Sequence, residues 1–410
     1  MEIIKGAAVI GQSGGPTAAI NATLAGVIKG LLDSESVTDI FGMRNGIEGF
    51  LREDLIDLRS YFDGRPEKLD LLSRTPAAAL GSCRKKLPKP DEDPEFFERL
   101  VALFKKHGIR YFFYIGGNDS MDTVAKLSAY VKKVGYDLTV AGVPKTIDND
   151  LTSTDHTPGF GSAAKYIATV MQEIIRDCSV YTVPAVTVVE IMGRDAGWLT
   201  ASAALSGAAG GARPDYIYLP EKPFSHDAFL RDVKAALERH PGVVVAVSEG
   251  LRCADGHYVG EGTQSGALDV FGHKYLSGTG KALELFIKEK IGCKVRSVEL
   301  NLPQRCAAHI ASGTDIGESL AIGEAAAKKA LCGNSGFMMS MVRGEGEYSV
   351  TFEAKDVSTI ANAVRCVPDE FINADCNDVT DGCIEYLKPL IVGEVAHTYT
   401  AGLPDIFVFD

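Results

Sequence analysis

The sequence repeats one order of apolar and polar positions. A short apolar run is followed by a loop that contains glycine, and then by a stretch whose apolar residues recur at helical spacing. In the first repeat the run is Lys5–Ile10, the loop is 11–16 and the helical stretch is Thr17–Leu32. One face of that stretch carries Ile20, Leu24, Val27, Ile28 and Leu31. The pattern predicts a strand, a loop and a helix in this order.

The same order returns along most of the chain. The further apolar runs that we predict to be strands are Tyr111–Ile115, Leu138–Val143, Ala185–Ile191, Tyr216–Leu219 and Val243–Ser248. Strands that alternate with helices predict an α/β fold in which parallel sheets are covered by helices on both faces. A chain of 410 residues is too long for one simple core. We expect two doubly wound units, residues 1–205 and 206–410, with an approximate boundary that the chain can cross again.

Composition excludes some classes of partner. The net charge of −12 argues against binding to nucleic acid or to an anionic membrane surface, whereas a few local arginines and lysines can still hold phosphate. The sequence contains no window of about 18 apolar residues, so we expect no membrane span. The nine cysteines are scattered without a CxxC pair, and the chain begins without a signal-peptide pattern. We therefore expect a cytoplasmic protein with reduced thiols.

Unusual loops follow the predicted strands, at the end where parallel sheets bind ligands. The first is SGGP, Ser13–Pro16, which precedes a predicted helix. Two glycines before a helix can cradle a phosphate with free backbone N–H groups, although a tight turn is the alternative. A second such loop, GGNDS at Gly116–Ser120, adds Asp119. We expect a helix from Met121, and the alternative role for Asp119 is that of an N-cap for this helix.

The loop PKTIDND, Pro144–Asp150, is the most informative. Phosphoryl transfer to an alcohol needs a base near the attacking hydroxyl and a cation near the phosphates. Asp148 can accept the proton, and Lys145 can neutralise the charge that develops on the phosphates. The alternative is a loop held together by Asx turns. The charged, proline-rich stretch Lys86–Pro94, in contrast, is expected to be an exposed connection.

Three arginines and a glutamate complete the candidate set. Arg194 follows a predicted strand and can hold phosphate oxygens, unless it pairs with a neighbouring carboxylate. Glu249 follows another strand, where it can accept hydrogen bonds from sugar hydroxyls or act as a cap. Arg296 and Arg305 bracket a short segment and suit a sugar phosphate. Two solvated surface arginines are the alternative.

Taken together, these segments resemble the phosphofructokinase family. The motifs SGGP, GSCR, GGNDS, PKTIDND, TPGFGSAAKY, EIMGR and SEG, followed by the pair of arginines, occur in that family's order over about residues 5–315. The resemblance implies two phosphofructokinase-like α/β units with the active site between them. It also implies an enzyme that phosphorylates the 1-hydroxyl of fructose 6-phosphate.

At matching positions the resemblance implies individual roles. Gly14 contacts the phosphates of the donor, and Arg84 reaches the phosphoryl group that is transferred. Asp148 is the base, and Arg194 stabilises the transition state. The implied sugar-phosphate contacts are Thr146, Ile147, Asp148, Met192, Gly193, Arg194, Glu249, Arg296, Leu302, Pro303, Gln304 and Arg305, with Arg296 and Arg305 on the 6-phosphate.

Two positions point to the donor. ATP-using members of the family usually have glycine where this chain has Asp119 and Lys145, and the residues present match the pyrophosphate-dependent branch. A carboxylate at Asp119 would repel the α-phosphate of a nucleotide. Lys145 would supply positive charge to a small and highly anionic donor. We therefore expect pyrophosphate as the donor, with Lys145 and Asp119 among the catalytic residues.

The chain departs from the family pattern at three positions. Asn118 stands where most members have a metal-binding Asp, and a neutral amide is a weaker ligand for Mg²⁺. The Mg²⁺ ligands are therefore expected among Asn118, Asp119 and Asp150. Ala185 stands where many members carry an arginine for the 6-phosphate, and Leu302 where many have His or Tyr.

The resemblance also bears on assembly and leaves alternatives open. In the family, arginines equivalent to Arg296 come from a neighbouring subunit, which implies a homodimer or homotetramer. One alternative is an ATP-dependent 6-phosphofructokinase. Another is a sedoheptulose-7-phosphate kinase, because Ala185 and Leu302 leave room for a larger sugar. A non-catalytic regulatory subunit of the same fold is the third, and retention of Asp148 and Glu249 argues against it.

Overall fold

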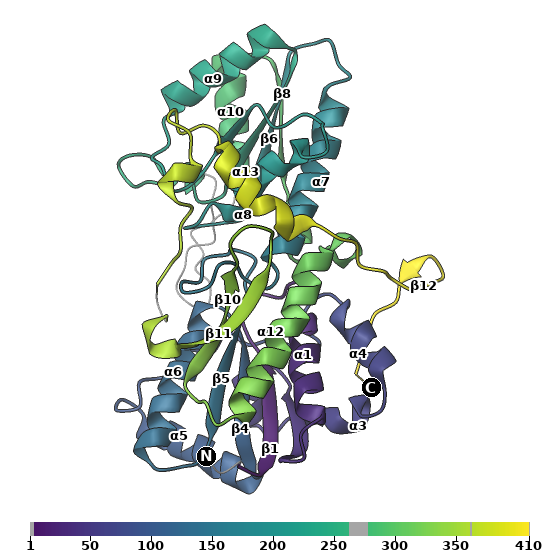
Figure 1. Cartoon of the computed structure of the whole chain (residues 1–410). Coiled ribbons are helices and arrows are strands. Elements are labelled where there is room, and N and C mark those ends of the chain that lie inside the picture. The colour runs from purple at the N-terminus through teal and green to yellow at the C-terminus, as the bar shows by residue number, and fades with distance from the viewer. Residues whose placement is uncertain (1–3, 262–277, 361–362, 410) are drawn as a thin grey trace.

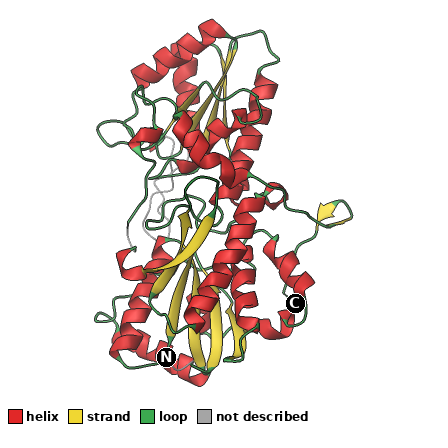
Figure 2. Cartoon of the chain, in the orientation of Figure 1, coloured by secondary structure: helices red, strands yellow, loops and turns green. Residues whose placement is uncertain are grey.

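The computed structural model describes residues 4–261, 278–360 and 363–409, which form two α/β units arranged one above the other (Figure 1). In each unit a sheet is flanked by helices (Figure 2). The two large sheets are built mainly from parallel strands. The predicted fold class is therefore confirmed.

The first sheet has seven strands in the order β11-β10-β5-β4-β1-β2-β3. These strands are β1 (Gly6–Gln12), β2 (Val37–Met43), β3 (Leu55–Asp57), β4 (Ile109–Gly116), β5 (Thr139–Pro144), β10 (Phe337–Arg343) and β11 (Val350–Asp356). The five inner strands pair in parallel, and the edge strands β3 and β11 pair antiparallel with their neighbours. The central strands β1, β4 and β5 are buried on both faces, as helices on both sides require.

The second sheet has four parallel strands in the order β7-β8-β6-β9. They are β6 (Ala185–Ile191), β7 (Tyr216–Tyr218), β8 (Gly242–Ser248) and β9 (Lys294–Glu299). Strands β6 and β8 are almost fully buried, whereas β9 is an exposed edge strand. A separate hairpin of β12 (Tyr399–Thr400) and β13 (Leu403–Pro404) projects from the side of the molecule (Figure 1).

The α-helices of the described residues fall into the same two groups. Those of the first unit are α1 (Ile20–Leu32), α2 (Gly46–Leu51), α3 (Leu58–Phe62), α4 (Pro66–Ser73), α5 (Pro94–Lys106), α6 (Asn118–Lys133) and α12 (Gly313–Leu331). Those of the second are α7 (Phe160–Cys178), α8 (Trp198–Ala201), α9 (His226–Arg239), α10 (Thr279–Lys290), α11 (Pro303–Cys306) and α13 (Asp381–Leu387).

Two helices begin at residues other than those predicted. All five apolar residues of the predicted face of α1 are fully buried, but the helix begins at Ile20 because the Thr17 hydroxyl accepts the Ile20 N–H at 2.9 Å. Helix α6 begins at Asn118 instead of Met121. The side chains after Gly117 therefore stand on the first turn of a helix, and no side chain caps it.

The chain crosses between the two sheets on both sides of the expected boundary near residue 205. Strand β6 precedes it and belongs to the second sheet, and β10 and β11 follow it and belong to the first. The chain recrosses because α12 packs along α1 and β10 then pairs with β5. Glycines permit this close helix contact, since a Cβ on Gly26 would lie 2.0 Å from the Leu320 carbonyl oxygen.

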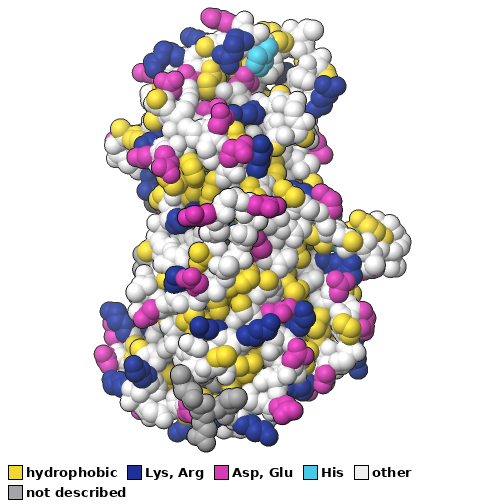
Figure 3. Space-filling model, viewed as in Figure 1, with side chains coloured by type: hydrophobic (Ala, Val, Ile, Leu, Met, Phe, Trp, Pro, Cys, Tyr) yellow, Lys and Arg dark blue, Asp and Glu magenta, His cyan; other side chains and the backbone are white. Residues whose placement is uncertain are grey.

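The visible surface mixes charges of both signs. Lys and Arg side chains alternate with Asp and Glu side chains on the face seen in Figure 3, without a broad area of one sign. Among the described residues, no helix is both long and apolar enough to cross a lipid bilayer.

Candidate active site

One cavity of about 500 Å³ lies where loops of the two units meet. The loops that follow β1, β4 and β5 form one wall, and those that follow β6 and β8 form the other. The predicted site residues that line this cavity are Gly14, Arg84, Asn118, Asp119, Lys145, Thr146, Ile147, Asp148, Asp150, Met192, Arg194, Glu249 and Arg305. Residues that are far apart in the sequence are thus brought together at the carboxyl ends of the strands.

The SGGP loop is backed by positive charge. Lys145 donates from Nζ to the carbonyl oxygen of Gly15 at 2.6 Å. A Cβ on Gly14, where φ is +77°, would lie 3.2 Å from Lys145 Nζ, and a Cβ on Gly15 would lie 3.2 Å from Arg305 Nη1. The two glycines therefore let the backbone approach an ammonium and a guanidinium closely. The N–H groups of Ser13 and Gly14 already donate to the carbonyl oxygens of Ile115 and Cys83, so a phosphate at this loop would be held mainly by the two cations.

Lys145 is buried, with 2% of its surface exposed. Burial lowers the pKa of Lys145 to about 8, while the nearby carboxylate of Asp148 acts in the opposite direction. At neutral pH the side chain still carries its charge, and it does so with little competition from water. Such a cation interacts strongly with a bound anion.

The TIDND loop turns sharply at Asn149, whose φ is 55°. The Asp148 N–H donates to the hydroxyl of Thr146 at 3.1 Å, so a side-chain turn does hold this loop. Burial raises the pKa of Asp148, and Lys145, Arg194 and Arg305 oppose this shift. A half-buried carboxylate surrounded by cations is a suitable proton acceptor at neutral pH.

Asn118 and Asp150 face each other beside this loop. Asn118 donates from Nδ2 to Asp150 Oδ2 at 3.3 Å, and the buried Asn118 Oδ1 has no hydrogen-bond partner among the residues that the structure describes. Burial, together with the nearby charge of Asp148, raises the pKa of Asp150 to about 7. The amide oxygen and the carboxylate thus form a small acceptor-rich corner of the cavity.

Asp119 lines the cavity and forms an ion pair there. Its carboxylate lies 3.1 Å from Nζ of Lys86. Its position on the first turn of α6 also places it near the positive end of the helix dipole. Lys86 was missed by sequence analysis because the stretch Lys86–Pro94 was expected to be an exposed connection. Lys86 lines the cavity, and the adjacent Leu87 is buried.

The second wall is held by hydrogen bonds among its own loops. Glu249 accepts the Gly193 N–H at 3.1 Å, and burial raises the pKa of Glu249 to about 8. Gln304 accepts the Met192 N–H at 3.2 Å, so its side chain supports the loop instead of lining the cavity. Gly193 is needed here because its φ is +127°. Gly193 therefore shapes the wall through its backbone.

Arg194 reaches the cavity without a neighbouring carboxylate as its partner. Asp195 pairs instead with Arg252, and Glu190 accepts backbone N–H groups at the start of α10. The Nε of Arg194 is buried and has no hydrogen-bond partner within the described part of the chain. This arginine is therefore available to an anion in the cavity.

Other predicted sugar contacts do not line the cavity. Leu302 is 55% exposed, and Pro303 opens the short helix α11. Arg296 lies on the edge strand β9, where it lines a separate surface depression together with Lys294 and Ala185. A single chain therefore leaves Arg296 outside the site to which it was assigned.

Comparison with known proteins identifies the family. The phosphofructokinase family model matches residues 7–326. The chain belongs to the phosphofructokinase family. The pyrophosphate--fructose 6-phosphate 1-phosphotransferase of Halomonas elongata is 41% identical over 401 residues, which cover 96% of this chain and 94% of the relative. A sulfofructose kinase of Alkalicoccus urumqiensis is 32% identical over 366 residues, covering 88% and 91%.

A solved phosphofructokinase also matches the whole chain. The crystal structure of the pyrophosphate-dependent phosphofructokinase of Nitrosospira multiformis superposes with a TM-score of 0.87 at 38% identity. The match covers 98% of this chain and 95% of that one. Membership of the phosphofructokinase family and its two-unit fold are therefore both established for this chain, as the resemblance implied.

Proposed function

We propose that the protein transfers a phosphoryl group from pyrophosphate to the 1-hydroxyl of fructose 6-phosphate, reversibly, giving fructose 1,6-bisphosphate and phosphate. The relatives from Halomonas elongata and Nitrosospira multiformis carry names with the same donor. The observation that carries the proposal is the donor wall, where Lys145 lies against the Gly14–Gly15 backbone and Asp119 pairs with Lys86.

The chemistry at the acceptor is proton removal by Asp148. This carboxylate accepts the proton of the 1-hydroxyl as that oxygen attacks the nearer phosphorus, and the bond between this phosphorus and its bridging oxygen breaks. Phosphate then leaves, and the proton passes from Asp148 to solvent. The raised pKa of Asp148 supports this role, because a stronger base accepts a proton more readily.

Cations supply most of the stabilisation of the transition state. Phosphoryl transfer spreads negative charge over the oxygens of the transferring group, so positioned cations act where the charge develops. Lys145 serves the donor from beneath the glycine loop, Arg84 reaches over the transferring group, and Arg194 approaches from the second wall. All three line the one cavity.

The acceptor-rich corner fits Mg²⁺. The unpartnered Asn118 Oδ1 and the Asp150 carboxylate are the hard oxygen ligands that this ion prefers. No group of three or more His, Cys, Asp or Glu among the described residues forms a protein cage, but Mg²⁺ commonly keeps waters and binds through one or two protein ligands and substrate phosphates. Asp119 is less suitable because one of its oxygens already pairs with Lys86. A bound Mg²⁺ would neutralise phosphate charge.

Donor choice follows from Asp119 and its partner. A carboxylate on the first turn of α6 faces the cavity beyond the glycine loop, where the remainder of a nucleotide would have to pass. That carboxylate would repel a third phosphate. Lys86 holds it in place and adds a cation within reach of the outer phosphate of a short donor. Both features favour pyrophosphate over ATP.

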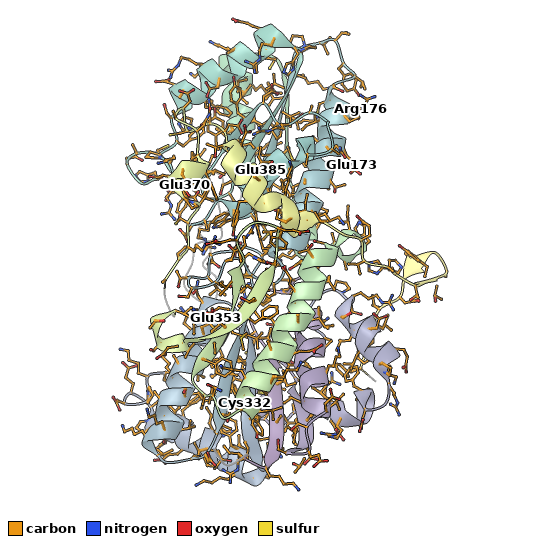
Figure 4. The ribbon with its side chains drawn as sticks, viewed as in Figure 1. Glu173, Arg176, Cys332, Glu353, Glu370 and Glu385 are labelled. Carbon is orange, nitrogen blue, oxygen red and sulfur yellow. The ribbon has the colours of Figure 1, made fainter. Side chains whose placement is uncertain are left out.

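The 6-phosphate is bound with the help of a second copy of this chain. Arg296 and Lys294 are exposed on β9, and Lys294 pairs in register with Ala185. Many members of the family have an arginine at the position of Ala185. Lys294 thus places a cation beside that position. The same face exposes Val180, Tyr181 and Val183. Beside it, Glu173 and Arg176 lie on the outer side of α7 (Figure 4). An apolar patch next to two cations suits a homo-oligomer contact.

A matrix of two donors against three acceptors tests the proposal. Purified protein with Mg²⁺ should transfer from pyrophosphate to fructose 6-phosphate and give little product with ATP. Sedoheptulose 7-phosphate and sulfofructose are the comparison acceptors, the latter because of the Alkalicoccus urumqiensis relative. An ATP rate that equals the pyrophosphate rate would establish the ATP-dependent alternative. Absence of transfer with every pair would support a regulatory subunit.

The substitution Asp119→Gly sharpens this test. Removal of the carboxylate should admit ATP weakly and damage use of pyrophosphate, because Lys86 would lose the partner that positions it. The substitution Asp122→Gly serves as a control on the same helix, where Asp122 pairs with Lys126 away from the cavity. Equal donor preference in the Asp119→Gly variant and the wild type would refute the role of Asp119.

A further inference from the structure

A short segment connects the two units beside the active cavity. After β11 the chain returns to the second unit, and residues 363–367, which we name the crossing segment, run past the cavity on the way. Val364 of this segment lines the cavity, and Val367 is buried. The crossing segment belongs to none of the motifs that predicted the active site.

Arg365 joins two catalytic loops through its backbone. Its N–H donates to the carbonyl oxygen of Asp150 at 2.7 Å. Its own carbonyl oxygen accepts the indole Nε1–H of Trp198 at 2.9 Å. Asp150 ends the loop that carries Asp148, and Trp198 follows Arg194 by four residues (198 − 194). One residue thus bridges the loop of the first sheet and the loop of the second.

The side chain of Arg365 is fixed on two sides. Its guanidinium lies over the ring of Trp198, 4.4 Å from the centroid, and Trp198 is fully buried. Arg365 Nη2 donates to the hydroxyl of Tyr386 at 3.0 Å, and that hydroxyl donates to the carbonyl oxygen of Asp155 at 2.7 Å. A cation over a desolvated indole interacts more strongly than one at the surface. The stack therefore anchors the crossing segment where its backbone meets both loops.

A shared carboxylate strengthens the same junction. Glu221 Oε1 accepts the N–H of Val367 at 2.8 Å and the N–H of Gly197 at 2.7 Å. Gly197 immediately precedes Trp198, so this second connection ties the crossing segment to the Arg194 loop again. The segment is thus held to the second wall at two points and to the first wall at Asp150.

We propose that Arg365 is a positioning residue, which holds the crossing segment between the Asp150 loop and the Trp198 loop and so sets the spacing of Asp148 and Arg194. Arg365 does not itself line the cavity. The inference rests on the proposed phosphotransfer, in which Asp148 acts on the attacking hydroxyl and Arg194 on the phosphoryl group that it attacks. Displacement of a reacting group by about 1 Å can cost roughly 10²-fold in rate.

The test combines kinetics with fluorescence. Trp198 is the single tryptophan of the sequence, so its emission reports directly on the stack with Arg365. Arg365→Met should lower kcat by about 10- to 100-fold while the KM for each substrate changes little, because binding groups stay in place. In the ligand-free variant, the emission of Trp198 should change and its quenching by acrylamide should rise. Arg365→Lys should recover part of kcat.

A matched arginine separates positioning from general stability. Arg213 in the second unit pairs with Asp378 at 2.7 Å and touches neither catalytic loop, so Arg213→Met should leave kcat unchanged. Should Arg365→Met fail to fold, Arg365→Gln, which keeps a donor toward Tyr386 without the charge, takes its place. A kcat within twofold of wild type in the folded variant would overturn the inference. So would equal kcat losses in the Arg365 and Arg213 variants.

The two proposals fail in different ways. If the wild-type protein does not transfer phosphate from pyrophosphate, the proposed function fails and Arg365 has no reaction to position. If the wild type is active and Trp198 emission responds to Arg365→Met, an unchanged kcat rejects the positioning role alone. If neither the emission nor kcat changes, the stack itself is absent in solution and the inference is also rejected.

Discussion

The two walls of the active cavity differ in how much of the site a single chain supplies. The first wall brings together each predicted residue for the donor phosphates and the base, and these residues are Gly14, Arg84, Asp119, Lys145 and Asp148. The second wall brings in Arg194, Glu249 and Arg305 but leaves Arg296 outside on β9. The residues predicted for the donor therefore all line the cavity of a single chain, whereas those predicted for the sugar do not.

Sheet position explains this difference. The donor loops follow β1, β4 and β5, which are adjacent central strands, so that their carboxyl ends lie side by side. Arg296 lies on an edge strand whose outer side pairs with no other strand of the described residues. Edge strands offer their surface to other chains. The comparison teaches that the fold of one chain gathers the residues proposed for the donor, whereas it leaves Arg296, a residue proposed for the sugar, on a separate surface.

The largest expected effect tests the base on the complete wall. Asp148→Asn removes the proton acceptor but keeps the shape of the side chain, so kcat should fall by about 10²–10⁴-fold. The KM for fructose 6-phosphate should change only a few-fold, because the other sugar contacts remain. Steady-state kinetics at saturating pyrophosphate measure both values. Turnover near that of wild type would remove Asp148 from the role of base.

The next effect tests the incomplete wall. Arg296→Ala should raise the KM for fructose 6-phosphate by tenfold or more, and the KM for pyrophosphate much less. Mixed oligomers of Arg296→Ala chains and Asp148→Asn chains should regain activity. In a mixed dimer, one of the two sites combines an intact Asp148 with an intact Arg296. Random mixing of equal amounts into dimers should therefore restore about a quarter of the sites. Verified mixed oligomers without any recovery would show that the site is not shared.

A smaller effect concerns the charge beneath the donor loop. The pKa of Lys145 is lowered to about 8, so its charge is present below that pH and is lost as the pH rises through it. The ratio kcat/KM for pyrophosphate should therefore decline above about pH 8. In Lys145→Arg this alkaline decline should move to higher pH, since arginine keeps its proton. The ionisation of pyrophosphate itself affects the wild type and the Lys145→Arg variant alike. If the pH profiles of kcat/KM coincide for these two proteins, Lys145 is not the titrating group.

The smallest effect concerns the partner of Asp119. Lys86→Gln should raise the KM for pyrophosphate by about two- to fivefold, because half-exposed ion pairs contribute little energy. Lys89→Gln, which removes an exposed lysine of the same connection paired with Glu92, should leave the KM unchanged. A similar shift in both variants would indicate long-range charge instead of a specific contact.

Sequence patterns predicted the parts of the site that depend on local order. Strand β6 was predicted with its observed bounds, and each predicted catalytic loop follows a buried strand. Such loops are predictable because strand, loop and helix are contiguous. The contact of Lys86 with Asp119 joins residues 33 positions apart (119 − 86), and that of Arg365 with Asp150 joins residues 215 apart (365 − 150). Periodicity carries no information on such pairings.

The helix start of α6 shows a finer limit. Apolar spacing indicated a helix from Met121, but Asn118 to Ser120 already adopt helical geometry without a side-chain cap. The preceding strand and the SGGP loop hold this end of the helix, since a Cβ on Gly116 would lie 3.2 Å from the Ser13 carbonyl oxygen. Tertiary packing therefore decided the boundary where local propensity did not.

The late return of the chain to the first sheet has a consequence for biosynthesis. Strand β5 leads directly into the catalytic loop, but its second neighbour, β10, is made only after almost the entire second unit. At about 5–20 residues per second, the interval between residues 144 and 337 lasts roughly 10–40 s. Throughout that time the edge of β5 lacks its partner strand β10, and one side of α1 lacks the helix α12 that packs on it. The nascent enzyme thus exposes an aggregation-prone edge for longer than its compact final form suggests.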